Sequence, residues 1–113
     1  MQRLPNRLID GSQLTTSAAT YYTTPANTIT TIAACTLTNT TVGAVTATVH
    51  LVPNGGTATA SNMILSARVI AAGESFNVGS AIGQSLAAGG TIQALASTGA
   101  SISLVASGYA TNP

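Results

Sequence analysis

The chain has 113 residues, of which 45% are apolar and only 4% are charged, and its formal net charge is +1. This is the length of one ordinary domain, but a typical soluble domain carries charges at about a quarter of its positions. With three arginines and no lysine, the sequence lacks the basic surface that binding to nucleic acid requires.

The first segment, residues 1–12, predicts an arm outside the folded domain. It holds three of the five charged side chains, set among apolar ones. Such a mixture suits a segment that lies along a neighbouring subunit, and a frayed terminus is the alternative. No signal-length apolar run follows the arginines, so we expect no secretory leader. The residues that we expect to contact a partner are Arg3, Leu4, Arg7, Leu8, Ile9 and Asp10.

From Gln13 onward, apolar and polar residues alternate with period two, and turn residues interrupt the alternation about every ten positions. This spacing predicts one all-β domain over residues 13–113, an antiparallel β-sandwich of the jelly-roll or immunoglobulin-like kind with about seven or eight strands. A glycine-broken segment at 79–86 is compatible with one helical turn. The expected strands are 14–22, 28–38, 44–52, 62–70, 75–78, 91–97 and 101–109.

The alternation also predicts which side chains share a face of the sheet. In 28–38, one face carries Ile29, Thr31, Ala33, Cys35 and Leu37. In 44–52, the inward face carries Val45, Ala47, Val49 and Leu51, and the outward face carries Thr46, Thr48 and His50. In 101–109, the inward residues are Ile102, Leu104 and Ala106.

Few residues could carry out chemistry. The carboxylates are Asp10 in the expected arm and Glu74 in a turn, where a catalytic pair is not expected. Cys35 is the lone cysteine, which excludes an internal disulfide, and its pattern predicts a small buried thiol. His50 has no orienting carboxylate nearby in the sequence, so we expect a surface or interface histidine. We therefore expect no enzyme, no metal and no cofactor.

Aromatic residues make up only 4% of the chain, with no tryptophan. The core must therefore be aliphatic, and aliphatic side chains bury less area than aromatic ones. Because a net charge near zero also protects poorly against association, we expect the chain to work as part of a permanent assembly. No stretch is long and apolar enough to predict a membrane span.

Several turn-and-strand segments resemble small virion proteins of tailed bacteriophages. They are residues 21–28, 37–41, 49–57, 86–94 and 102–108. The resemblance implies a capsid decoration or cement protein, often a homotrimer, made in the host cytoplasm and bound in the virion to the major capsid protein or other virion proteins. A tail- or fibre-associated module is the alternative in the same class, and a carbohydrate-binding, adhesin-like domain is the alternative from another class.

Overall fold

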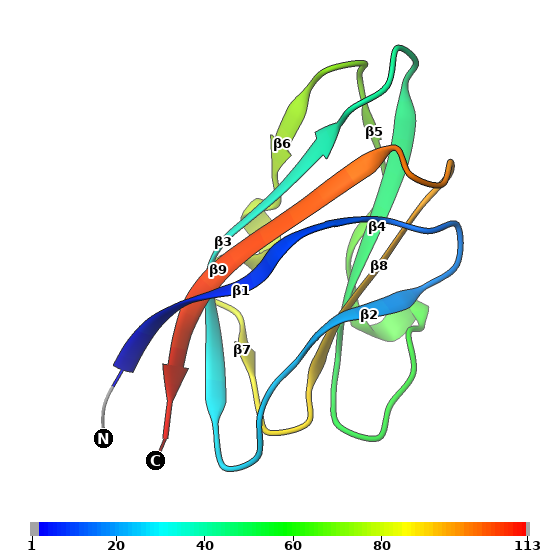
Figure 1. The fold of residues 1–113 in the computed structure, drawn as a ribbon. Helices are drawn as coiled ribbons and strands as arrows, with labels where there is room; N and C mark the ends of the chain where they lie inside the picture. Colours follow the sequence, from blue (N-terminus) through cyan, green and yellow to red (C-terminus); the bar gives the residue numbers. More distant parts are fainter. Residues whose placement is uncertain (1–2, 113) are drawn as a thin grey trace.

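The computed structural model describes residues 3–112, which form two antiparallel β-sheets packed face to face (Figure 1). The expected all-β sandwich is confirmed. Met1 and Gln2 of the expected arm, Pro113 and the side chain of Arg3 lie outside this description. The strands are β1 (Arg3–Gln13), β2 (Ala19–Thr23), β3 (Ile29–Asn39), β4 (Val45–Val52), β5 (Met63–Ile70), β6 (Ser75–Asn77), β7 (Ser85–Leu86), β8 (Thr91–Ala96) and β9 (Ile102–Thr111).

The strand pairing is that of a jelly roll. Sheet A has the order β1-β9-β3-β6, with β7 also paired to β3, and sheet B has the order β2-β8-β4-β5. The pairs are nested: β1 with β9, β2 with β8, β3 with β6 and β7, and β4 with β5. This nesting of antiparallel pairs defines the double-sheet jelly roll and excludes the immunoglobulin-like arrangement. Two short 3-10 helices, η1 (Ala60–Asn62) and η2 (Gly79–Ala81), interrupt the connections, and η2 lies where we expected one helical turn.

The segment that we expected to be an arm is instead an edge strand of sheet A over its described part. Strand β1 pairs with β9 along its length, with register shifts between Arg7 and Ile9 and between Ile9 and Ser12. A β-bulge of this kind breaks the alternation of faces. Leu8 (8% exposed) and Ile9 (3%) are consequently both buried in the core, whereas Leu4, Arg7 and Asp10 are exposed.

Strands β4 and β9 follow the predicted alternation. Ile102, Leu104 and Ala106 of β9 are buried. In β4, the inward residues Val45, Ala47 and Val49 are buried in the same core, and Leu51 is partly buried against it.

Strand β3 changes face part-way along its length. Its register with β9 shifts between Ile32 and Ala34, so side chains before this bulge are out of phase with those after it. Cys35 and Leu37 face the core as expected, but before the bulge Thr30 and Ile32 are the buried residues. The prediction that Ile29, Thr31 and Ala33 share a face with Cys35 and Leu37 was therefore wrong, since these three residues are exposed or half-buried.

The bulge brings the backbone of β3 close to Gly108 of β9. Gly108 pairs with Ile32, and a Cβ atom added to Gly108 would overlap the carbonyl oxygen of Thr31. Only a residue without a side chain fits at this position.

We therefore predict that Gly108→Ala lowers the free energy of unfolding by roughly 3 kcal/mol, because the two paired strands must move apart. Urea unfolding of the variant and the wild type measures this difference. Gly99→Ala is the matched control, because a Cβ at Gly99 meets no atom within 4 Å. Equal losses in the two variants would contradict the predicted clash.

Asn39, the last residue of β3, is fully buried and bonds to both sheets. Its Nδ2 donates to Gly43 O at 2.8 Å and to Ile70 O at 2.9 Å. Its Oδ1 accepts from Thr41 N at 2.9 Å and from Thr41 Oγ1 at 2.7 Å. This one side chain therefore joins the end of β3 to the β3–β4 loop and to the end of β5.

We predict that Asn39→Asp costs about 3 kcal/mol or more of stability, because both donors are lost and a carboxylate is buried against two carbonyl oxygens. The control is Asn77→Asp. Asn77 is exposed and uses only its Oδ1, which accepts from Thr36 Oγ1, so its bond survives the change. Denaturant midpoints of the two variants decide the matter, and similar midpoints would refute the role given to Asn39.

Candidate functional site

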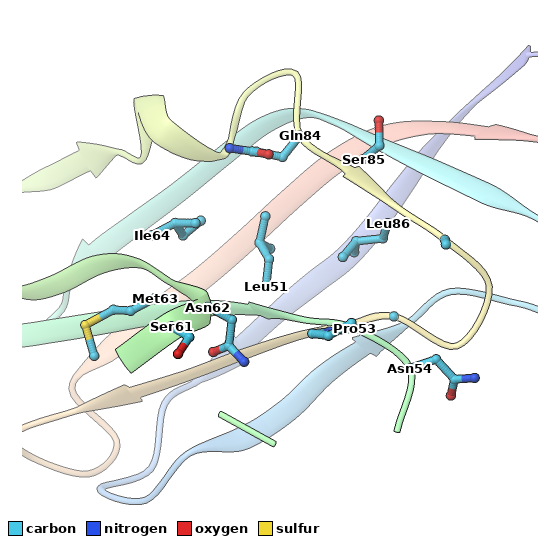
Figure 2. A pocket seen from close by; sticks show the side chains of 12 residues that line it. Leu51, Pro53, Asn54, Ser61, Asn62, Met63, Ile64, Gln84, Ser85 and Leu86 are labelled. Atoms are coloured by element: carbon cyan, nitrogen blue, oxygen red, sulfur yellow. The ribbon is translucent and has the colours of Figure 1, made fainter. Parts of the chain in front are cut away.

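A pocket of about 640 Å³ opens between the two sheets at the edge bordered by β5 and β7 (Figure 2). Three segments form it: the end of β4, the start of β5 with η1, and the segment around β7. Its apolar lining residues are Leu51, Pro53, Met63, Ile64, Leu86 and Ala87. Its polar lining residues are Asn54, Ser61, Asn62, Gln84 and Ser85, with Gly90 completing the wall.

No lining residue of this pocket is charged. Figure 2 shows Leu51 and Leu86 extending into the space between β4 and the segment that carries Gln84 and Ser85. The volume and the combination of apolar floor with a few polar groups are typical of ligand pockets in proteins. The arrangement suits an uncharged group with an apolar body.

His50 holds one wall of the pocket in place. It lies on the outer face of sheet B, as expected, but it is buried (4% exposed) rather than at the surface, because the chain from Pro53 to Asn62 folds over it. Its Nδ1 lies 3.0 Å from Thr59 O and 2.9 Å from Asn62 Oδ1. Since Asn62 Nδ2 donates to Thr57 O, Asn62 Oδ1 is the acceptor and Nδ1 of His50 carries the proton. His50 therefore anchors the β4–β5 loop.

Two contacts join the sheets along the open edge next to the pocket. Ser80 Oγ in η2 donates to Ile64 O of β5 at 2.8 Å. The guanidinium of Arg68 on β5 lies 4.5 Å from the ring centroid of Phe76 on β6, which is cation–π geometry. The two contacts together fix the distance between β5 and the edge of sheet A.

The side chains that could take part in chemistry, those of Cys35, His50, Asp10 and Glu74, do not lie together in one site. Cys35 is buried in the core from sheet A, whereas His50 is on the outer face of sheet B. Asp10 is exposed on β1, and Glu74 Oε1 accepts from Ala71 N within its own turn at 3.0 Å. Within residues 3–112, no group of His, Cys, Asp and Glu side chains is suited to hold a metal ion. The same residues contain no helix long and apolar enough to cross a membrane.

A shallower hollow of about 400 Å³ lies where β1, β9 and the bulge of β3 meet. It is lined by Pro5, Asn6, Arg7, Ala33, Ser107, Gly108 and Tyr109. Of the residues expected to contact a partner, the structure thus places Arg7 beside Tyr109 and leaves Leu4 and Asp10 exposed elsewhere on β1. Leu8 and Ile9 are on the opposite, buried side.

Comparisons with known proteins leave the family of this chain open. No protein-family model and no curated protein matches the chain. Among solved structures, a chain in the structure of infectious bursal disease virus, Gx strain, matches with a TM-score of 0.46 and 19% sequence identity. The match covers 96% of this chain but only 30% of that one. A likeness at this level identifies neither a family nor a function.

Burial raises the pKa of the Cys35 thiol from an ordinary value of 9.0 to about 11, because the core disfavours the thiolate. Above pH 9 the unfolded chain loses a proton that the folded chain keeps, so stability is present below that pH and is lost as pH rises toward 11. The shift corresponds to about 2–3 kcal/mol.

We predict that Cys35→Ala removes this part of the pH dependence. Urea unfolding of both proteins between neutral pH and pH 11 provides the measurement, and the difference between them isolates the thiol, because every other titrating group is present in both. The wild type should lose its advantage over Cys35→Ala as the pH rises. A constant difference over the whole range would show that the thiol does not contribute.

Proposed function

We propose that this chain is a structural protein of a virus particle and, more narrowly, a decoration or cement protein on the capsid of a tailed bacteriophage. The jelly roll is an architecture of viral capsid domains, and also of lectins and cupins. Fold alone does not select among these. The observation that carries the proposal is where the charges lie on the jelly roll.

All five charged residues lie on edge strands or in a turn. Three are on β1, one is on β5, and Glu74 is in the β5–β6 turn, and β1 and β5 are edge strands. The strands between the edges carry no arginine, aspartate or glutamate. On the outer face of sheet A, neutral pairs link neighbouring strands, such as Thr38 with Ser75 at 3.0 Å. The central strands of both outer faces can therefore be buried against a partner without desolvating an ion.

Burial of such faces gives the proposed mechanism. A protein that binds only the assembled shell stabilises that shell by mass action. The partners are the major capsid protein or other virion proteins, and copies of the chain itself, with a trimer as the favoured oligomer. The chain acts without catalysis, metal or cofactor, and it reaches the virion from the host cytoplasm. Partner contacts of β1 are made by its exposed side chains Leu4, Arg7 and Asp10.

A tail- or fibre-associated module would use the same neutral faces. Its position on the particle distinguishes this function from that of a capsid cement protein. Carbohydrate binding is favoured by one observation, the placement of Tyr109 beside Asn6 and Arg7 in the shallower hollow. Glycan sites commonly pair an aromatic ring with polar groups. The larger pocket has no aromatic residue, so the glycan alternative rests on the shallow hollow alone.

Images of purified particles test the proposal. We expect on the order of hundreds of symmetry-related copies over the shell, whereas about a dozen or fewer at one vertex would assign the chain to the tail. A particle without the protein should lose resistance to heat or denaturant and regain it when the purified protein is added. Binding of glycans, with no copies on the particle, would favour the adhesin-like function.

The same particles test the contacts of β1. Leu4→Asp combined with Arg7→Glu changes exposed side chains only, so the fold should survive while occupancy on the shell falls. Val69→Asp is the control, because Val69 is also exposed but lies on β5. Equal occupancy of the two variants would remove β1 from the interface.

A further inference from the structure

The β3–β4 loop carries an apolar side chain on a rigid tip. Val42 is fully exposed, the most exposed large apolar side chain among the described residues. The loop around it is held by Asn39, which donates to Gly43 O, and by Thr41, whose backbone N–H donates to Asn39 Oδ1 and whose hydroxyl lies within bonding distance of Asn39 Oδ1 and Gly43 O. A valine side chain is itself stiff. The loop is thus preordered, and little conformational entropy would be lost if it bound in a cavity.

The pocket between the sheets matches this tip in chemistry. Leu51, Ile64 and Leu86 supply an apolar floor, and Asn54 and Ser85 place uncharged polar groups at its rim. The loop, residues 40–44, offers one large aliphatic side chain flanked by threonine hydroxyls and peptide groups, and neither surface carries a charge. A pocket with an apolar floor and a few polar groups is the default binding-site hypothesis in a protein, and the uncharged, apolar tip is a suitable occupant for it.

The tip and the pocket lie at opposite ends of the same molecule. Strand β4 runs from the β3–β4 loop at one end of the sandwich to the β4–β5 loop at the other (Figure 1). The residues on either side of its last residue, Leu51 and Pro53, line the pocket. A strand of this length spans about 25 Å. Val42 therefore cannot fill the pocket of its own chain, and any contact between the two requires a second copy.

We propose that the Val42 tip of one copy inserts into the pocket between β5 and β7 of the next copy. The contact is heterologous, with two different patches, so copies join head to tail. If the rotation that relates one copy to the next closes a ring after three copies, the contact produces the trimer proposed above. The inference rests on the proposed function, since it names the contact between copies that an assembling protein needs.

Self-association of the purified full chain tests the contact. Sedimentation velocity compares the wild type with Val42→Asp and Ser85→Arg, which change exposed side chains on the tip and at the pocket rim. We expect each variant to associate at least ~tenfold more weakly than the wild type. Val69→Asp, an equally charged change at another exposed valine, should associate as the wild type does. A monomeric wild type, or equal association of Val42→Asp and Val69→Asp, would overturn the proposal.

Disulfide trapping tests the pairing of the two patches directly. Under mild oxidation, a mixture of Val42→Cys and Ser85→Cys chains should yield a cross-linked heterodimer, whereas neither variant alone should cross-link. The wild type is the blank, because its Cys35 is buried. Cross-linking of Val42→Cys to itself would show an isologous contact and overturn the proposal. Denaturant midpoints equal to that of the wild type exclude misfolding as the cause of any loss.

The two proposals fail in different ways. If the purified chain does not associate through the tip and pocket but particles still carry many copies, this contact is wrong and the virion role stands. If the tip and pocket cross-link but no copies are found on particles, the contact stands and the virion role is wrong.

Discussion

The buried carboxamide of Asn39 holds one end of the sandwich together. Its side chain bonds to the β3–β4 loop and to the end of β5, and its backbone N–H and C=O bond to the β5–β6 turn at Glu74 and Gly73. An amide has two donors and an acceptor oxygen, so one neutral residue satisfies several orphaned backbone groups. An ion pair at the same place would carry a much larger desolvation cost. The rigidity of the Val42 tip follows from these bonds.

The charged residues of the chain lie on the edge strands β1 and β5 and in the β5–β6 turn. Strand β1 is a long edge strand, and such edges invite pairing with other chains. Pro5, Arg7, Asp10 and the two register shifts are the features by which natural sheets prevent that pairing. Arg68 on β5 stacks on Phe76 instead. These features protect the backbone of the edge from pairing, while the central strands of both sheets carry no arginine, aspartate or glutamate.

The sequence predicts the fold best where strands alternate without interruption, as in β4 and β9. It fails at bulges. Two consecutive apolar residues, Leu8 and Ile9, face inward only because β1 is irregular there, and β3 changes face at a position with no local signal. His50 was assigned to the correct face, but its burial depends on a loop ten residues further along. The nested pairing joins the two ends of the chain, so no short-range pattern could distinguish a jelly roll from an immunoglobulin-like sandwich.

The pocket was missed for the same reason, since its walls come from three separate parts of the chain. Its physical origin lies in the strand lengths. Strands β6 and β7 are short, so the edge of sheet A is incomplete there. The one phenylalanine, Phe76, lies on β6 and packs both against the core and under Arg68, and it is not among the residues that line the pocket. The pocket therefore opens where sheet A covers the apolar inner face of β4 and β5 incompletely, a long-range consequence of strand pairing that no local pattern reveals.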